Sequence, residues 1–192
     1  GSEMCIRDRN LGDAYDMPVL LAAIEQLAAA GRPIRFTLIG AGPWEEQAAA
    51  LATRFPDCVR FLGRMPPAAL PAMYGQAQVG LATYSQGSTV SMPTKLFDYL
   101  AAGLATVGSP SGEAAALLRQ GAGLHYQAGS ITDLVAKLNV YIDDRAKLTA
   151  ARRYAYDQAP QFDQDAQYER FVALVERVAA TTSVETEGKP VD

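Results

Sequence analysis

Cysteine and histidine are scarce in this chain of 192 residues, which has two cysteines, Cys5 and Cys58, and one histidine, His125. The cysteines are far apart and have no histidine companion, so neither a disulfide framework nor a zinc site is indicated. A reducing cytoplasm is therefore the simplest setting. Because the single histidine falls in a predicted strand, a Ser-His-Asp triad or a histidine general acid lacks its parts.

An excess of positive charge is also lacking. The 17 Lys and Arg residues are scattered and are outnumbered by 21 Asp and Glu residues, giving a net charge of −4, which argues against a nucleic-acid platform. Apolar stretches are interrupted well before the roughly 18 residues that a membrane-spanning helix needs, so any membrane contact would be peripheral. The hydrophobic content of 49% is instead that of a globular protein, and the length favours one domain.

The two ends of the chain differ in composition from its centre. Residues 1–9, GSEMCIRDR, are polar and charged and lack the apolar stretch of a signal peptide. We expect them to be a non-native leader outside the fold, in place of the domain's first strand. Residues 181–192 have the composition of a flexible, solvated tail. The predicted domain therefore covers residues 10–180.

Between these ends, predicted strands alternate with predicted helices. The β-branched and apolar runs predict strands at 34–39, 59–62, 79–83, 105–108 and 124–127. Helices are predicted at 15–30, 43–54, 67–77, 93–102, 112–119, 130–143, 145–158 and 163–180. Strands separated by helices of about ten residues form right-handed βαβ units, so the fold class is α/β with a doubly wound, Rossmann-like parallel sheet. Its ligand site should lie beyond the carboxyl ends of the strands, at 40–44, 63–67, 84–94 and 108–113.

Several familiar motifs are incomplete. The segment 40–45, GAGPWE, begins like a dinucleotide fingerprint, but Glu45 stands where the third glycine is needed. The chain has neither the Gly-Lys-Ser/Thr of a P-loop nor a GxSxG nucleophile elbow. Asp143 and Asp144 have no third carboxylate nearby to complete a metal site. These chemistries are therefore not indicated.

The loop 84–94 and the helix after it remain the best candidate site. The loop is rich in glycine and hydroxyl side chains, and Lys95 and Asp98 follow in the first turns of the predicted helix. Backbone amides at a helix N-terminus together with a cation suit a diphosphate, which would also explain a lysine that opposes the helix dipole. Asp98 either pairs with Lys95 or accepts hydrogen bonds from a vicinal diol such as a ribose. Phosphate binding and an ordinary capped helix both stay open.

Four ordered segments carry a resemblance to a known family. They are LIGAGPWEEQ at 38–47, VRFLGRMPPAALPAMY at 59–74, VGLATY at 79–84 and SMPTKLFDYLAAGLATVGS at 91–109. Residues 10–180 thus resemble the C-terminal, nucleotide-sugar-binding half of a GT-B glycosyltransferase of the family-four, or group 1, retaining type.

The resemblance implies roles for individual residues. Asp98 falls at the second glutamate of the family's Glu-x7-Glu motif, which holds the donor ribose, and Val90 replaces the first. Lys95 would face the diphosphate and, with Asp98, form the catalytic pair, so we expect Lys95→Ala to weaken nucleotide binding far more than folding. The other implied donor contacts are the backbone of Gly12, Gly40 and Gly42, the strand end Arg60, Phe61 and Leu62, and the backbone amides of the loop residues Ser88, Thr89, Val90 and Ser91.

The implied function is transfer of a sugar, with retention, from a UDP- or GDP-linked donor to an acceptor hydroxyl in polysaccharide or glycolipid synthesis. No metal or other cofactor would be required. The N-terminal acceptor domain would be missing, so this chain alone is expected to be inactive. The full-length protein would be cytoplasmic, at the inner face of a membrane. The alternatives are a non-catalytic nucleotide-binding module, a nucleotide-sugar epimerase of the same fold and a protein-interaction domain.

Overall fold

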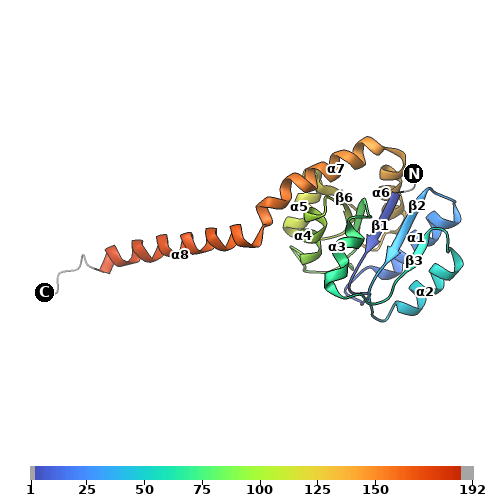
Figure 1. Cartoon of the computed structure of the whole chain (residues 1–192), viewed down its shortest axis with the longest axis horizontal. Helices are drawn as coiled ribbons and strands as arrows, with labels where there is room; N and C mark the ends of the chain where they lie inside the picture. The colour runs from blue at the N-terminus through green and yellow to red at the C-terminus, as the bar shows by residue number, and fades with distance from the viewer. Residues whose placement is uncertain (1–2, 187–192) are drawn as a thin grey trace.

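A computed structural model describes residues 3–186, which form a parallel six-stranded sheet with helices on both faces and one long helix that leaves the body (Figure 1). The strands are β1 Glu3–Arg7, β2 Ile34–Leu38, β3 Val59–Phe61, β4 Val79–Ala82, β5 Ala105–Gly108 and β6 Gly123–His125. The helices are α1 Met17–Ala29, α2 Glu45–Arg54, α3 Leu70–Tyr74, α4 Thr94–Ala101, α5 Gly112–Leu117, α6 Ile131–Asp143, α7 Arg145–Gln158 and α8 Gln164–Thr186.

The order of the strands confirms the predicted fold class. The sheet runs β3-β2-β1-β4-β5-β6, and every neighbouring pair is parallel. The chain thus winds outward from β1 to β3, crosses back, and winds the other way from β4 to β6. This is a doubly wound α/β sheet whose direction reverses between β1 and β4, the point where such sheets bind ligands.

The central strand β1 corrects one expectation. Residues 1–9 were expected to lie outside the fold, but Glu3–Arg7 pairs with β2 along its length and with β4 at Cys5 and Ile6. Because successive side chains of a strand point to opposite faces, Cys5 packs under α1 and Ile6 packs under α3 and α4. The charges of Arg7 and Asp8 are buried and partnered within the protein. Residues 3–9 therefore belong to the fold, whereas residues 1 and 2 lie outside the described part.

Two apolar layers hold the helices to the sheet. One contains the buried faces of α1, α2 and α6, with Leu20, Leu51 and Leu138 among its members. The other face is covered by α3, α4 and α5, whose side chains form two adjoining clusters. Helix α7 joins both faces, since its N-terminal half packs with α1 and α6 while Ala155 packs with α4 and α5. The helices thereby fix the loops at the carboxyl edge of the sheet.

Local sequence signals account for several helix ends. Ser130 caps α6 as its sequence indicates, because its Oγ accepts a hydrogen bond from the Asp133 backbone N–H at 3.1 Å. Gly103 follows α4 with a left-handed φ of 60°, as expected for the residue that stops a helix. The expectation that Pro43 begins a helix is wrong, because α2 begins at Glu45. The Glu45 carboxylate instead accepts a hydrogen bond from the Gly42 N–H.

Helix α8 is longer than its pattern predicts. It runs from Gln164 to Thr186, so residues 181–186 are helical rather than part of a flexible tail, and residues 187–192 lie outside the described part. Figure 1 shows α8 extending away from the body. Its large apolar side chains are 46–67% exposed; they are Tyr168, Phe171, Leu174, Val175 and Val178. No helix in the described part of the chain is long and apolar enough to cross a membrane.

The contact between Gly80 of β4 and Tyr99 of α4 yields a stability prediction. A Cβ atom at Gly80 would lie 2.3–2.6 Å from three atoms of the Tyr99 ring, which is fully buried. We expect Gly80→Ala to lower the free energy of unfolding by about 1–3 kcal/mol because the ring has no room to move away. Urea denaturation measures this change.

Gly75→Ala is the matched control for that substitution. Gly75 has a helical φ of −59°, and its Cβ would meet nothing closer than 3.6 Å. This variant should be neutral or more stable by about 0.4–1 kcal/mol, because alanine restricts the unfolded chain. Equal stability of the two variants would contradict the packing argument.

Candidate functional site

The candidate site lies at the carboxyl edge of the sheet, where β1 and β4 diverge. A large cavity of 750 Å³ and a small cavity of 390 Å³ open there, and Arg9 lines both. The large cavity is also lined by Asn10, Ile39, Gly40, Ala41, Arg64, Met65, Pro66, Pro67 and Leu70. The other residues of the small cavity are Tyr15, Tyr84, Val90, Met92, Pro93, Thr94 and Lys95. The two cavities thus meet at a cationic side chain.

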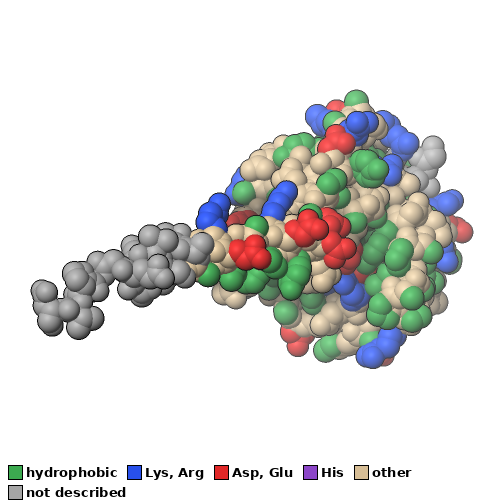
Figure 2. All heavy atoms as spheres, turned by 60° about the vertical axis from the view of Figure 1, so that its left-hand side comes forward, with side chains coloured by type: hydrophobic (Ala, Val, Ile, Leu, Met, Phe, Trp, Pro, Cys, Tyr) green, Lys and Arg blue, Asp and Glu red, His purple; other side chains and the backbone are tan. Residues whose placement is uncertain are grey.

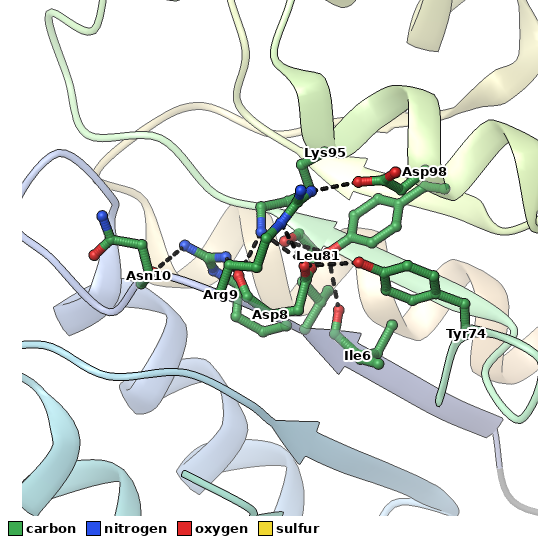
Figure 3. A network of polar contacts seen from close by, with 10 residues as sticks. Ile6, Asp8, Arg9, Asn10, Tyr74, Leu81, Lys95 and Asp98 are labelled. Atoms are coloured by element: carbon green, nitrogen blue, oxygen red, sulfur yellow. Dashed lines mark hydrogen bonds and ion pairs between the residues drawn. The ribbon is translucent and has the colours of Figure 1, made fainter. Parts of the chain in front are cut away.

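A buried carboxylate, Asp8, organises the floor of the site (Figure 3). It accepts hydrogen bonds from the hydroxyls of Tyr99 at 2.6 Å and Tyr74 at 2.8 Å, and it pairs with Lys95 Nζ at 3.0 Å and Arg9 Nε at 2.9 Å. Burial alone would raise the pKa of Asp8, but the Lys95 charge and the hydrogen bonds outweigh burial and lower the pKa to about 2. Asp8 is therefore ionised at neutral pH.

Lys95 lies deeper than its sequence position suggests. It stands in the first turn of α4, as predicted, but it is buried, and its Nζ also donates to the Asp8 carbonyl at 2.5 Å. Burial is the main cause that lowers its pKa from 10.5 to about 7; Arg7 adds to this effect, and Asp8 opposes it. The anion that accounts for this first-turn lysine is thus the carboxylate of Asp8, although Lys95 still lines the small cavity.

Asp98 lies one turn further along α4 and nearer the surface. Its side chain is 41% exposed, and one of its carboxylate oxygens pairs with Arg9 at 2.5 Å rather than with Lys95. Burial opposes the charge of Arg9, but Asp8 and Asp98 outweigh burial and raise the Arg9 pKa. Arg9 therefore joins the buried carboxylate to the exposed one, at the junction of the two cavities (Figure 3).

The loop between β4 and α4 is anchored at both ends. At its start, the Ser109 hydroxyl accepts from the Tyr84 N–H and donates to the Tyr84 carbonyl, each at 2.8 Å. At its far end, Ser91 contacts the start of α5, since its carbonyl accepts from the Ala114 N–H at 3.0 Å. Of the four loop residues predicted to contact the donor, only Val90 lines the small cavity; Ser88, Thr89 and Ser91 do not.

The glycines at 40 and 42 serve a contact between loops. Both have positive φ angles, and a Cβ at Gly40 would lie 2.5 Å from the Arg9 carbonyl oxygen. A Cβ at Gly42 would lie 2.6 Å from the Leu11 carbonyl oxygen. Their lack of a side chain therefore lets the loop after β2 lie against the loop after β1. Gly40 additionally lines the large cavity, whereas Gly42 and the predicted Gly12 line neither cavity.

The predicted strand end at residues 60–62 does not line either cavity. Arg60 instead borders a separate depression with Cys58 at the edge of the sheet, and Phe61 and Leu62 pack against the core. The wall of the large cavity is formed by the next residues along, from Arg64 to Pro67. Residues 60–62 thus precede the cavity wall, and the predicted ligand segment 63–67 supplies it.

Sequence reasoning missed several residues of the site. Asp8, Arg9 and Asn10 fall in or beside the segment expected to lie outside the fold, and Tyr15 belongs to no motif. The position of Arg64 directly after a predicted strand was the signal available for the large cavity. Within residues 3–186, no three His, Cys, Asp or Glu side chains group as a metal site requires.

The charge distribution suits a particular kind of ligand. Arg9 and Lys95 place positive charge where the cavities meet, whereas Ile39, Met65 and Leu70 give the large cavity an apolar wall. Such a cleft fits a molecule whose central part is anionic and whose two ends are uncharged, because each part then meets complementary surface.

The solved structures of similar fold come from chains that are longer than this one. The α,α-trehalose 6-phosphate synthase of Burkholderia multivorans matches with a TM-score of 0.76 and 19% identity over 100% of this chain and 46% of its own. The pneumococcal O-GlcNAc transferase GtfA, in complex with UDP and GlcNAc, matches with a TM-score of 0.73 and 20% identity. That match covers 93% of this chain and 37% of GtfA. HepE of Anabaena, in complex with UDP, matches with a TM-score of 0.71 and 19% identity. That match covers 95% of this chain and 49% of HepE. The chain therefore spans less than half the length of these structures.

Comparison of sequences identifies the family. No curated protein matches significantly. Residues 11–144 match the family described as group 1 glycosyl transferases, a stretch that begins just after Asn10 of the large cavity and includes Lys95, Asp98 and the anchored loop. The doubly wound sheet is the fold expected for one half of a GT-B enzyme, and the chain belongs to the group 1 glycosyltransferase family.

Proposed function

We propose that this chain is the donor-binding half of a retaining glycosyltransferase that transfers a sugar from a UDP- or GDP-linked donor to an acceptor hydroxyl. The observation that carries the proposal is the pair of cavities that meet at Arg9, with Lys95 beside them. A nucleoside diphosphate sugar has the same order of parts, a nucleoside and a sugar on either side of an anionic diphosphate. The order of its parts and the position of its charge therefore match those of the cleft.

The sizes of the cavities assign the parts of the donor. The nucleoside is the larger end group, so it takes the 750 Å³ cavity and stacks on the apolar wall that includes Met65 and Pro66. The sugar takes the 390 Å³ cavity. Between them the diphosphate contacts Arg9 and Lys95. The phosphates compete with Asp98 for Arg9 and weaken that ion pair. The exposed Asp98 carboxylate then accepts hydrogen bonds from the ribose hydroxyls.

Catalysis at such a site consists of positioning the sugar and stabilising the leaving group. When the bond between the sugar and the diphosphate breaks, negative charge grows on the departing phosphate oxygen. We propose that Arg9, protonated Lys95 and the positive end of the α4 helix dipole stabilise that charge. In this proposal these groups supply the positive charge, so that neither a metal ion nor another cofactor is required.

The acceptor is proposed to bind a second, N-terminal domain. The matched structures are more than twice as long as the region that they share with this chain. Helix α8 also has large apolar side chains that are 46–67% exposed, and Figure 2 shows hydrophobic side chains near the base of this helix. A second domain would cover them.

We further propose a role in polysaccharide or glycolipid synthesis, at the cytoplasmic face of a membrane.

A non-catalytic nucleotide-binding module is the second candidate. It is favoured by Val90, which places an apolar side chain in the small cavity beside the cations, where an enzyme of this kind commonly has a carboxylate. Both candidates bind a nucleoside diphosphate, so binding tests the site, whereas sugar transfer by the full-length protein distinguishes an enzyme from a module.

The pH dependence of nucleotide binding tests the role of Lys95. In the free protein its pKa is about 7, and a bound diphosphate would raise it, so binding takes up a proton above that pH. We expect the affinity for UDP or GDP to fall by up to about tenfold per pH unit between about pH 7 and pH 9. Titration calorimetry in buffers of different ionisation enthalpy measures the proton uptake directly.

The same pKa shift has an effect on folding that serves as a check. Between about pH 7 and the ordinary value of 10.5, the unfolded chain holds the lysine proton that the folded chain has lost. The free energy of unfolding should therefore rise with pH in this window, and bound nucleotide should reduce the slope. Lys95→Ala is a poor test, because it removes one of the two cations paired with the buried Asp8 carboxylate, at a cost to folding of up to about 3–5 kcal/mol. A nucleotide affinity independent of pH would refute the role of Lys95.

Discrimination between ribose and deoxyribose tests the role of Asp98. The native chain should bind UDP or GDP about tenfold more tightly than the 2′-deoxy nucleotide, because the deoxy sugar leaves one carboxylate hydrogen bond unmade. Asp98→Asn should reduce this ratio to about two. Asp143→Asn, which removes an exposed carboxylate paired with Arg32, is the control and should keep the native ratio. If neither UDP nor GDP binds the native chain, the proposed function is wrong.

Sugar transfer by the purified chain tests the need for a second domain. We expect no release of nucleoside diphosphate above background from a donor that binds, because nothing holds an acceptor hydroxyl against the sugar. A coupled assay for UDP or GDP measures the release, and the Asp98→Asn variant gives the background. Sustained turnover by the native chain would show that the chain is sufficient by itself.

A further inference from the structure

The small cavity has two chemically different sides. Arg9 and Lys95 form its cationic side. The remaining side chains are apolar or aromatic apart from Thr94; they are Tyr15, Tyr84, Val90, Met92 and Pro93. Val90 is 41% exposed, and its own backbone N–H and carbonyl are both hydrogen-bonded. The side chains of Val90, Met92 and Pro93 therefore offer a ligand apolar surface and no good hydrogen-bond partner.

The backbone around Val90 is held against α5. The Ser111 hydroxyl donates to the Val90 carbonyl at 3.1 Å, and the Ser88 hydroxyl accepts from the Val90 N–H at 3.4 Å. The next residue, Ser91, accepts from the N–H groups of Glu113 and Ala114. Gly112 makes this packing possible, because a Cβ there would lie 2.1 Å from Ser91 Oγ. The valine side chain is thus fixed as part of the cavity wall.

Tyr15 and Tyr84 give the small cavity an aromatic surface as well. Tyr15 and Tyr84 contact each other with ring centroids 5.4 Å apart, and the Arg7 guanidinium lies over the Tyr15 ring at 4.3 Å. The Tyr84 backbone is held on both sides by Ser109, and burial raises the pKa of its hydroxyl to about 12. Aromatic, aliphatic and cationic side chains thus line the small cavity together, and the contacts described above hold Tyr15 and Tyr84 in place.

We propose that Val90 determines donor specificity, and that the small cavity selects a donor sugar carrying an apolar methyl group, as a 6-deoxy or N-acetyl sugar does, over a fully hydroxylated hexose. This inference rests on the proposed function, which places the sugar in this cavity. A sugar hydroxyl turned toward Val90 and Met92 would lose its hydrogen bonds to water and gain none in return. A methyl group in the same place would be removed from water and would pack against both side chains.

Matched pairs of donors test this preference. UDP-glucose and UDP-6-deoxyglucose differ by one hydroxyl, as do GDP-mannose and GDP-rhamnose, and UDP-glucose and UDP-N-acetylglucosamine differ by one acetamido group. Titration calorimetry first shows whether UDP or GDP binds, and the pairs with that base are then compared. We expect the native chain to bind a methyl-bearing donor of that base about tenfold more tightly than its hydroxylated counterpart.

Substitutions at Val90 connect the preference to this residue. Val90→Thr keeps the shape and adds a hydroxyl, so it should reduce the ratio of affinities to about three, and Val90→Glu should abolish or reverse the preference. Val175→Glu places the same charge on the exposed face of α8, away from the cavity, and should keep the native ratio. Binding of UDP or GDP without a sugar should be the same in all four proteins to within about threefold.

The outcomes separate the two proposals. If neither nucleotide binds the native chain, the proposed function fails and this inference fails with it. If a nucleotide binds but both members of each pair bind equally, the proposed function stands and the inference is overturned. The inference is also overturned if the preference is present but unchanged in Val90→Glu.

Discussion

The buried carboxylate of Asp8 is the interaction on which the rest of the site depends. An isolated charge inside a protein is costly, and it is tolerated only when other groups supply opposite charge and hydrogen bonds. Here these groups come from α3 through Tyr74, from α4 through Tyr99 and Lys95, and from the adjacent Arg9. The end of β1 is thereby joined to the two helices that border the cleft. Gly80 adds to this arrangement, because its missing side chain leaves space for the Tyr99 ring.

The cleft is built from loops that cannot easily move apart. The glycines at 40 and 42 bring the loop after β2 against the loop after β1, and the loop after β4 is fastened to Ser109 and to the start of α5. These contacts set Arg9 between a large cavity and a small one. A ligand with an anionic centre and two uncharged ends meets a preformed surface there, which reduces the entropy lost on binding.

The parts of the fold that could be predicted from the sequence are those with strong local signals. Apolar runs marked β2 to β5 to within a residue of their observed ends, Ser130 and Asp133 marked the start of α6, and Gly103 marked the end of α4. The strand β1 could not be found in this way. It is short and has charged residues at both ends, so its pattern is that of a polar segment, and it becomes a strand because β2 and β4 pair with it on both sides.

For the site, the sequence by itself determined that Lys95, Asp98 and Val90 would lie at the carboxyl edge of a parallel sheet. That conclusion needs only the order of strands and helices and the rule that ligands bind where such a sheet reverses direction. Only the tertiary structure decided that Lys95 pairs with Asp8 and that Asp98 pairs with Arg9. The physical reason is that the partner of a buried charge is set by distance in space, and Asp8 and Lys95 are 87 positions apart in the chain.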